Sequence, residues 1–471
     1  MNENKIDYRF LARIVIEATT PLAVHSGDKE VETDAVIIRD VNGLPYIPGS
    51  SIAGVIRHAW KDAGNDDDIL FGFQKNPKEV KGNEAAGMGS RIIFSEARIL
   101  NSKGLVVDGL MPKEIDDDPL LKNYTNLPIR QHVRITHKGV AADKGKFDEQ
   151  VVFAGTRFCF EMEMTGSTQE EETFAKLISI LNHSSFRLGG SSRKGFGKVL
   201  VIEVMYCSLG IKDKEYLKKS SNLENDKQWY IDHSADLTKA DAAIRPMEKL
   251  CYDLRPDDFF LFGSGFGDDD ADMTPVKEQK VVWKGNAGEL TDYEYLIPAS
   301  SIKGALAHRV AYHYNLIDEF YADGKSQEEL EAHTGKNNKA VRLLFGYVDD
   351  ENGKDKQRGN VIISDMFIKA QDKVLNHVAI DRFTGGAIDG ALFSEKAAYW
   401  HGGENEYPLR LEVLIDEPAL KKADKKANKE NPIAENALLA LNKALDDLCK
   451  GLLSLGGGIN RGNGIFNGKK V

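Results

Sequence analysis

The chain has 471 residues, more than one hydrophobic core normally serves, so two domains of about 200 residues each are the first expectation. Hydrophobic residues make up 41% and charged residues 29% of the chain, which is an ordinary globular composition. The sequence contains no apolar run of the ~18 to 20 residues that a membrane-spanning helix needs, and its amino terminus lacks the basic-then-apolar pattern of a signal peptide. We therefore expect a cytoplasmic protein that does not contact a membrane.

The net charge of −11 argues only weakly against a nucleic-acid ligand, because affinity for phosphates depends on where Lys and Arg cluster. The four cysteines form no Cys-x-x-Cys pair, which disfavours a structural zinc site and a disulfide framework.

The first half of the chain begins with a predicted strand and an acidic loop. Phe10 to Ala18 is rich in β-branched residues and alternates towards its end, which predicts a strand. The acidic stretch His25 to Asp40 follows, and its apolar residues Ala35 to Ile38 predict a second strand. After a turn, Ser50 and Ser51 predict the start of a helix.

The second half repeats these features. Ser264 to Asp272 matches the acidic loop at an offset of 272 − 34 = 238, so that Asp34 pairs with Asp272. The same offset pairs Glu30 with Asp268, Glu32 with Asp270, and Asp40 with Glu278. At the helix start the offset is 297 − 47 = 250, so the intervening connection is 12 residues longer in the second half. Such length differences are typical of loops.

Four further matches follow in the same order, which indicates a duplicated domain. They are Leu70-Phe71-Gly72 with Leu344-Phe345-Gly346, Ile93 to Glu96 with Ile362 to Asp365, His132 to Ile135 with His377 to Ile380, and the glycine-rich Leu188 to Gly197 with Leu455 to Gly464. We predict a first domain over 1–207, a polar linker over 208–247 and a second domain over 248–471. The element order in each copy permits, without demanding, a ferredoxin-like α+β fold with two helices on one face of a sheet.

The glycine-rich segments and the helix starts are candidate phosphate sites. Glycines let backbone N–H groups approach a phosphate, and a helix N-terminus favours an anion. The nearby cations and histidines are Arg57, His58, Arg187, Arg193, Lys194, Lys198, Lys303, His308, Arg309, Arg461, Lys469 and Lys470. The alternatives are a tight structural turn and an ordinary capped helix. Neither copy has the spacing of a nucleotide-binding P-loop, which disfavours a mononucleotide cofactor.

A basic insertion and the acidic loop complete the candidates. Asn126 to Phe153 carries His132, Arg134 and other basic residues, and is typical of a projecting hairpin that contacts a nucleic-acid strand. Its counterpart, Asn376 to Phe393, has Arg382 as its one cation. The acidic loop is either a solvated surface or a site where an Asp with a hydrated Mg²⁺ assists phosphodiester cleavage.

Together, the acidic loop, the Ile-Pro-Gly/Ala-Ser-Ser-Ile helix start and the Arg193-Lys194-Gly195-Phe196-Gly197 loop resemble the RAMP superfamily of CRISPR-associated proteins. More narrowly, the chain resembles two fused backbone subunits of a type III CRISPR effector complex. This resemblance implies two ferredoxin-like, RNA-recognition-type domains with glycine-rich loops and thumb hairpins, here about 123–153 and 374–395. Such domains bind guide RNA, and an acidic-loop Asp cleaves target RNA with a divalent cation.

By position, the resemblance implies that Asp34 and Asp272 are the catalytic and metal-binding residues, with Asp268 and Asp270 as alternates to Asp272. The implied RNA-binding residues are Ser50, Ser51, Arg57, His58, His132, Arg134, Arg187, Arg193, Lys194, Ser300, Ser301, Lys303, His308, Arg309, Arg382, Asn460 and Arg461. The implied partners are guide RNA, single-stranded target RNA, a large polymerase/cyclase-type subunit, other RAMP subunits and a small subunit. Mg²⁺ or another divalent cation is the implied cofactor.

The second copy departs from this pattern at Ala299, which replaces the Gly49 of the first copy, and at Asn460-Arg461, which replaces Arg193-Lys194. Two alternative functions stay open. One is a catalytically inert backbone subunit, and the other is a guide-precursor-processing endonuclease that uses a histidine such as His25, whose counterpart is Gly263. An enzyme that binds a small phosphate compound is a remote third alternative.

Overall fold

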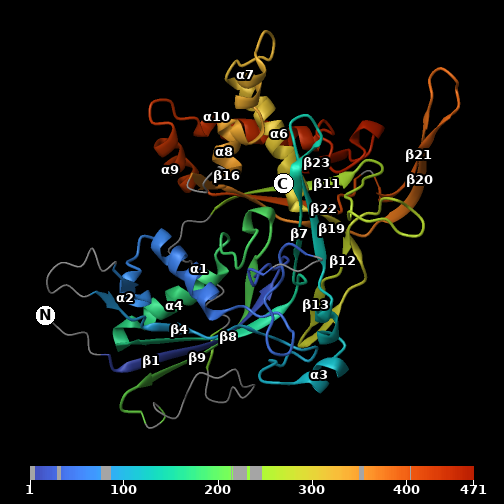
Figure 1. The fold of residues 1–471 in the computed structure, drawn as a ribbon. Helices are drawn as coiled ribbons and strands as arrows, with labels where there is room; N and C mark the ends of the chain where they lie inside the picture. The colour runs from blue at the N-terminus through green and yellow to red at the C-terminus, as the bar shows by residue number, and fades with distance from the viewer. Residues whose placement is uncertain are drawn as a thin grey trace.

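The computed structural model describes residues 6–28, 33–75, 86–213, 215, 231–233, 247–348, 355–403 and 405–471. The largest sheet of each half of the chain is antiparallel, and the main helices of that half pack on it (Figure 1). Glu30, Glu32 and most of the predicted linker 208–247 lie outside the described residues. No helix in the described ranges is both long and apolar enough to cross a membrane.

The first sheet is built around β1 (Tyr8–Ala18). This strand pairs antiparallel with β8 (Arg157–Gly166) on one side and with β9 (Val199–Gly210) on the other. The order of the sheet is β10-β9-β1-β8-β4, with β4 at Ile92–Phe94 and β10 at Ile231–Asp232. In chain order the elements are β1, α1 (Gly49–Asp62), β4, β8, α4 (Glu171–Ser179) and β9, which is the ferredoxin-like βαββαβ arrangement.

The alternation of a strand explains how β1 positions the helices. Phe10, Ala12, Ile14 and Ile16 are buried in the main core of the first half, where apolar residues of α1 and α4 pack against them. The intervening Arg13 forms an ion pair with Glu203 instead. Both helices therefore contact one face of the sheet. The largest of their core residues are Ile52, Ile56, Trp60, Phe174, Leu177 and Ile178.

The second sheet repeats this topology, with the order β18-β22-β11-β23. Its strands are β11 (Glu248–Pro256), β18 (Val361–Ile363), β22 (Leu409–Ile415) and β23 (Phe466–Lys470). The helices in its core are α6 (Ala299–Ile317), α8 (Lys339–Phe345), α9 (Glu417–Ala427) and α10 (Ala434–Cys449). The predicted ferredoxin-like fold and its duplication are thus confirmed at the level of strand order.

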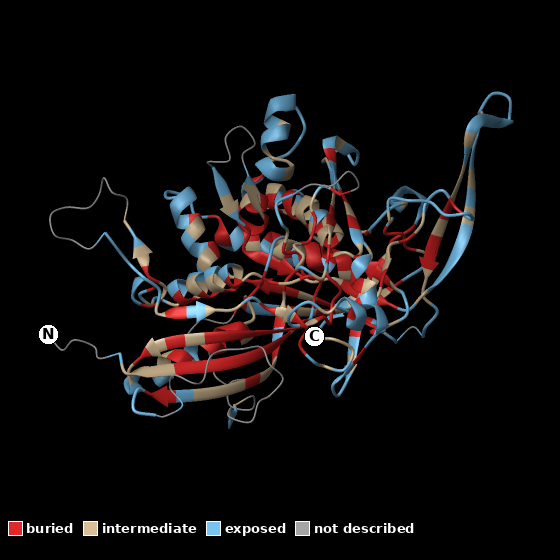
Figure 2. Ribbon diagram, turned by 60° about the horizontal axis from the view of Figure 1, so that its bottom comes forward, coloured by how far each residue is buried: buried red, intermediate tan, exposed pale blue. Residues whose placement is uncertain are grey.

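Each predicted insertion coincides with a long β-hairpin, and the second hairpin extends beyond the predicted 374–395 at both ends. The first hairpin consists of β6 (Ile129–Ile135) and β7 (Ala141–Gln150), and the second of β20 (Gln371–Ile380) and β21 (Ala387–Tyr399). Figures 1 and 2 show the second hairpin projecting from the body with an exposed tip. Phe383 at this tip is 91% exposed.

The remaining elements are short. They are α2 (Asp68–Phe71), β2 (Phe73–Gln74), β3 (Gly87–Met88), β5 (Arg98–Ile99), α3 (Pro112–Asp117), β12 (Lys277–Glu278), β13 (Val281–Lys284), β14 (Ala287–Leu290), β15 (Glu294–Ile297), α7 (Gln327–Ala332), β16 (Gly346–Val348), β17 (Lys356–Arg358) and β19 (Met366–Ile368). Single 3-10 turns are at Leu121–Thr125, Thr168–Glu170, Ile180–Asn182, Ser192–Lys194, Gly335–Asn337 and Ile459–Arg461.

Two sequence-based expectations are wrong in detail. The predicted strand Ala35 to Ile38 forms only an isolated bridge between His25 and Ile37. Its backbone makes two hydrogen bonds to the irregular segment 24–26, and the N–H of Ile37 donates to the side chain of Gln150, so no regular ladder develops. The helix expected over Ala434 to Leu455 ends at Cys449.

Candidate nucleic-acid interface

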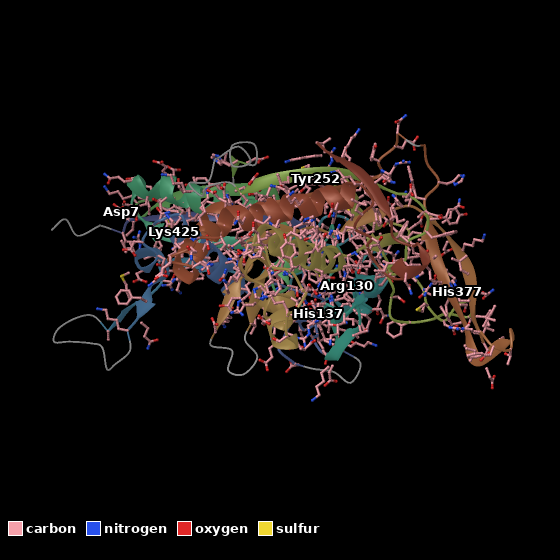
Figure 3. The ribbon with its side chains drawn as sticks, turned by 90° about the horizontal axis from the view of Figure 1, so that it is seen from above. Asp7, Arg130, His137, Tyr252, His377 and Lys425 are labelled. Carbon is pink, nitrogen blue, oxygen red and sulfur yellow. The ribbon has the colours of Figure 1, made fainter. Side chains whose placement is uncertain are left out.

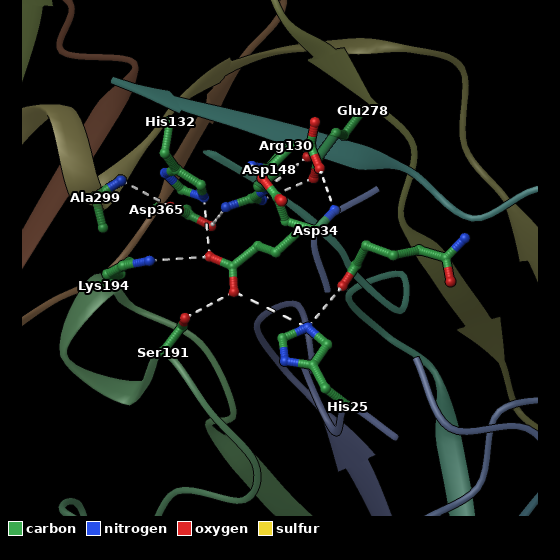
Figure 4. Close-up of polar contacts among 12 residues, drawn as sticks. His25, Asp34, Arg130, His132, Asp148, Ser191, Lys194, Glu278, Ala299 and Asp365 are labelled. Atoms are coloured by element: carbon green, nitrogen blue, oxygen red, sulfur yellow. Dashed lines mark hydrogen bonds and ion pairs between the residues drawn. The ribbon is translucent and has the colours of Figure 1, made fainter. Parts of the chain in front are cut away.

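The acidic loop of the first copy is attached to the base of the first hairpin. The backbone N–H of Asp34 donates to Oδ1 of Asp148 over 2.8 Å, and the N–H of Asp148 donates to Oδ2 of Asp34 over 3.3 Å. Figure 4 shows the two residues facing each other. Asp34 is exposed, so its carboxylate is presented to solvent in a fixed place beside the hairpin.

The second copy repeats this attachment with different chemistry. The N–H and the hydroxyl of Ser394 donate to Oδ2 of Asp272 over 2.7 and 3.0 Å, and the N–H of Asp272 donates to the Ser394 hydroxyl. The hydrogen bond from the Ser394 N–H holds the pKa of Asp272 below its ordinary value. Equivalent acids of the two loops thus occupy equivalent places at the base of a hairpin.

The neighbouring acids of the second loop differ from Asp272 because they contact a cation. Nζ of Lys396 lies 2.5 Å from Asp268 and 3.2 Å from Asp270. The hydrogen bond from Lys396 lowers the pKa of Asp268. These two carboxylates are neutralised within the protein, whereas Asp272 accepts its hydrogen bonds from a neutral serine.

A buried glutamate connects the first hairpin to the first glycine-rich loop. Glu149 is 4% exposed, and its carboxylate lies 2.9 Å from Nε2 of His132 and 3.1 Å from Nζ of Lys194, and it accepts a 2.8 Å hydrogen bond from the Ser191 hydroxyl. His132 also stacks on Phe147. Burial raises the pKa of Glu149, but the contacts with His132, Lys194 and Ser191 outweigh it and hold the pKa at about 2 (Figure 4).

The second copy has a corresponding cluster around Glu395, which is fully buried, with a histidine in the same place and different polar partners. Nε2 of His377 lies 3.2 Å from this carboxylate, Arg461 forms an ion pair with it, and Asn463 donates a hydrogen bond to it. His377 stacks on Phe393, as His132 stacks on Phe147. Sequence reasoning missed both glutamates. The available signal was an acid recurring at nearly the same distance from the repeated histidine, since 149 − 132 = 17 and 395 − 377 = 18.

Glu149→Gln is expected to lower the free energy of unfolding at pH 7 by about 3 kcal/mol, from the difference between pKa values of 4.5 and about 2. Because the folded pKa is depressed, the stabilisation is complete above pH 4.5 and is lost as the pH falls through 2. The urea transition of the first domain, followed from pH 7 to pH 2, measures this difference, with the exposed Glu172→Gln of the same domain as the matched control. A difference between wild type and Glu149→Gln that is constant over this pH range contradicts the assignment.

The two helix starts are not equivalent. At α6, the N–H of Ala299 donates to Oδ1 of Asp365 over 2.8 Å, so a carboxylate of the protein already lies at this N-terminus, next to Ser300 and Ser301. At α1, no side chain caps the helix start, and a cavity of about 380 Å³ lies over its first turns, where Ser50 and Arg57 line it. The first helix start therefore has space for an external anion, whereas at α6 the Asp365 carboxylate already accepts the hydrogen bond from the Ala299 N–H.

Cations gather where the first glycine-rich loop meets the second copy. Gly195 lies against Ile363 and Ala299 of the second copy. Burial, followed by the nearby charge of Arg358, lowers the pKa of Arg193 to about 9. Burial, followed by the charges of Arg193 and Lys194, lowers the pKa of Lys303 to about 8.

Arg187 belongs to the same group of cations. It is 5% exposed, burial lowers its pKa to about 10, and Glu412 opposes this shift. Among the residues that the structure describes, Nε and Nη2 of Arg187 and Nε and Nη1 of Arg193 have no hydrogen-bond partner. Sequence reasoning identified these two arginines and Lys303 but missed Arg358, whose role depends on the contact between the copies.

A model of the RAMP superfamily matches residues 15–200 and 261–467, which is most of the chain. The chain belongs to the RAMP superfamily. Its two halves are two RAMP domains, and RAMP proteins are CRISPR-associated proteins that generally bind CRISPR RNA and other effector subunits. No curated protein matches the chain.

The other predicted RNA-binding residues have varied surroundings in the two RAMP domains. Arg57 forms ion pairs with Asp67 and Asp68, and Arg309 with Asp447, so both guanidinium groups already contact carboxylates. His58, Arg134, Arg382 and Asn460 are exposed.

The first hairpin crosses the second RAMP domain. Burial lowers the pKa of His308 on α6, and the nearby His137 of the first hairpin lowers it further. A hydrogen bond with the backbone of Ile135 opposes this shift. In Figure 3 Arg130 and His137 lie over the body, whereas His377 lies on the projecting second hairpin. The first hairpin is therefore partly covered by the second domain, and the second hairpin is free along most of its length.

Proposed function

We propose that this chain is a guide-RNA-binding backbone subunit of a type III CRISPR effector complex and cleaves guide-complementary RNA at two positions. The observation that carries the proposal is the repeated attachment of one exposed aspartate, Asp34 or Asp272, to the base of a β-hairpin. A carboxylate fixed beside an RNA strand can hold a cation or a water in position for phosphodiester cleavage, and each RAMP domain has such a carboxylate at the base of its hairpin. Further partners in this proposal are a large polymerase/cyclase-type subunit, other RAMP subunits and a small subunit.

The guide strand would contact the cations at the junction. Burial is the main cause of the lowered pKa values of Arg187, Arg193 and Lys303. The charge of Arg187 further lowers the pKa of Arg193, and the charge of Arg193 further lowers that of Lys303. A phosphate placed among these cations would therefore relieve a repulsion between them. Base pairing between guide and target supplies sequence recognition, and the protein contacts backbone and shape.

The proposed reaction is an attack of a target 2′-oxygen on the adjacent phosphorus. The 2′-proton passes to the aspartate or to a neighbouring water, and the bond from phosphorus to the 5′-oxygen breaks. The departing 5′-oxygen takes a proton from a water, which leaves a 2′,3′-cyclic phosphate and a 5′-hydroxyl. The lowered pKa of Asp272 makes it a weak general base, which favours its acting by holding a cation or a water in position.

The residues at the first acidic loop fit a hydrated divalent cation. Mg²⁺ is usually held by one or two carboxylates and several waters, and Asp34 and Asp148 are two adjacent carboxylates. In the described ranges no three His, Cys, Asp or Glu side chains are grouped as a complete protein-ligand site. In the second domain Ser394 replaces Asp148, which leaves one carboxylate, Asp272. A bound divalent cation would stabilise negative charge on the phosphate oxygens.

The test uses the assembled complex with a double Asp34→Ala, Asp272→Ala variant. Loss of cleavage of guide-complementary RNA, with binding of both RNAs retained, is the expected result. Cleavage at unchanged rate and positions contradicts the proposal and leaves the inert backbone subunit as the function. Cleavage of precursor guide RNA by the isolated chain, abolished by His25→Ala, would identify a guide-processing enzyme.

Arg193→Ala is expected to weaken the binding of single-stranded guide RNA and to reduce the dependence of log K on log salt by about 0.7, the value for one phosphate contact on a single strand. Titrations at several salt concentrations measure this slope. Lys425→Ala, which removes an exposed cation on α9, is the matched control. Equal slopes for Arg193→Ala and wild type would show that Arg193 makes no phosphate contact.

A further inference from the structure

Arg130 of the first hairpin is buried in the second RAMP domain. Its guanidinium donates to both carboxylate oxygens of Glu278 over 2.6 and 2.7 Å and to Asp365 over 2.7 Å. Its side chain is 4% exposed, and the two carboxylates are 6% and 1% exposed. Figure 4 shows Arg130 between them. This three-residue ion cluster joins β6 to the second domain. The surface of that domain that carries Glu278 and Asp365 is called the acceptor face.

The first RAMP domain has the same pair of acids, but its own arginine occupies them. Asp40 and Glu96 are the repeat counterparts of Glu278 and Asp365. Arg98 lies 3.3 Å from Asp40 and also forms an ion pair with Glu96. The residue two positions after Asp365, equivalent to Arg98, is Phe367, so the second domain has no such internal cation.

The second hairpin lacks the arginine that the first hairpin supplies. Strand register makes the equivalence direct, since Arg130 pairs with Glu149 in the first hairpin and Leu375 pairs with Glu395 in the second. An approach of the second hairpin to the first domain of another copy would therefore bring a leucine to acids that Arg98 already neutralises. Such a contact covers charged groups without adding a hydrogen bond to them.

The 12 additional residues of the second copy form a second contact between the two domains. The extra segment of the second domain forms the β13–β14 hairpin, which packs on the first domain. The N–H of Val281 donates to Ala154 over 2.8 Å, and Nε1 of Trp283 donates to Gly155 over 2.7 Å. Arg157 stacks on the Trp283 ring at 4.3 Å. The first domain has only the short turn from Asp40 to Leu44 at this place.

We propose that the acceptor face for the Arg130 hairpin is dedicated to the pairing of the two domains within one chain, and that Arg98 closes the equivalent face of the first domain to further copies. The first hairpin fits the second domain of its own chain. The second hairpin of one copy does not fit the Asp40 and Glu96 face of another copy. Any neighbour at either of these two surfaces is therefore a protein other than a second copy of this chain. This inference concerns assembly and holds whether or not the acidic loops cut RNA.

The test is to make the outer ends complementary in the full-length chain. The variant combines Arg98→Phe, which frees Asp40 and Glu96, with Leu375→Arg, which supplies the missing cation, and replaces residues 41–43 with the segment 279–293. Light scattering across protein concentrations is expected to show wild type at the mass of one chain, and the variant rising to two chains or more with concentration. The control carries the segment replacement with Arg98 and Leu375 retained, and is expected to stay at one chain.

Two results overturn the proposal. The first is a wild-type mass that rises with protein concentration and returns to that of one chain in Leu375→Asp, because the second hairpin would then already bind another copy. The other is a fully folded variant, checked by its thermal unfolding, that stays at the mass of one chain. If the segment replacement prevents folding, the Arg98→Phe, Leu375→Arg double variant without it supplies the measurement, and its mass must rise above that of either single variant.

Discussion

Asp34→Ala is expected to abolish cleavage at one position of the guide-complementary RNA and to leave the position served by Asp272 unchanged. Loss of an acid that positions a proton or a cation typically lowers a rate by about 10²- to 10⁴-fold. Asp272→Ala is expected to have the reverse effect. Both acids attach through their hairpins rather than through the cation group, so RNA binding is expected to persist. Mapping the cleavage products of the assembled complex by end-labelled target RNA measures each position separately.

The matched controls are substitutions of neighbouring acids. Asp268→Asn removes a carboxylate that is already paired with Lys396, so it is expected to change cleavage little. If Asp268→Asn abolishes a cleavage position and Asp272→Ala does not, the assignment within the second loop is wrong. If neither Asp34→Ala nor Asp272→Ala changes any position, the acids are surface residues and the subunit is an inert backbone.

Arg130→Met is expected to lower the free energy that holds the two RAMP domains together by about 3–5 kcal/mol, because it leaves Glu278 and Asp365 buried without their partner. Burial opposes the charge of Arg130, but Asp365 and Glu278 outweigh it and raise the pKa of the guanidinium above its ordinary value. Hydrogen exchange of the amides in β6 and β12 measures the effect locally, which avoids treating a two-domain chain as a two-state system.

The control for Arg130→Met is Arg410→Met, which breaks the partly exposed pair with Asp253 and is expected to cost about 1 kcal/mol or less. Faster exchange confined to the junction strands in Arg130→Met is the expected pattern. Equal effects of the two substitutions would show that the buried cluster does not hold the domains together.

The order of the predicted elements and their repetition along the chain permitted the fold without demanding it. The hydrophobic periodicity of β1 and the ordered repeats predicted two copies of a ferredoxin-like domain, and strand orders confirm that topology. The prediction of a strand at Ala35 to Ile38 failed because this apolar segment lies in an irregular loop. Its backbone hydrogen bonds go to two different segments, 24–26 and Gln150, and do not form a continuous ladder. A hydrophobic sequence pattern indicates which residues are buried, but burial alone does not specify that their backbone pairs with a neighbouring strand.

The candidate site was only partly accessible from sequence. Asp34 and Asp272 were found because they recur in register, but their hydrogen bonds to Asp148 and Ser394 join residues 114 and 122 positions apart. Lys194 was expected to contact RNA, and its position against the buried Glu149 depends on the same kind of long-range contact. Whether it also contacts RNA stays a prediction.

The sequence by itself determined the duplication, the family resemblance and the two acids at the centre of the proposed reaction, because each is a pattern of residue types along the chain. Only the tertiary structure decided which cations are already paired, that Glu149 and Glu395 tie the hairpins to the glycine-rich loops, and that Arg130 joins the domains while Arg98 occupies the equivalent acids of the first domain. The physical reason is that ion pairs and burial depend on distances between segments far apart in the chain, which residue order does not contain.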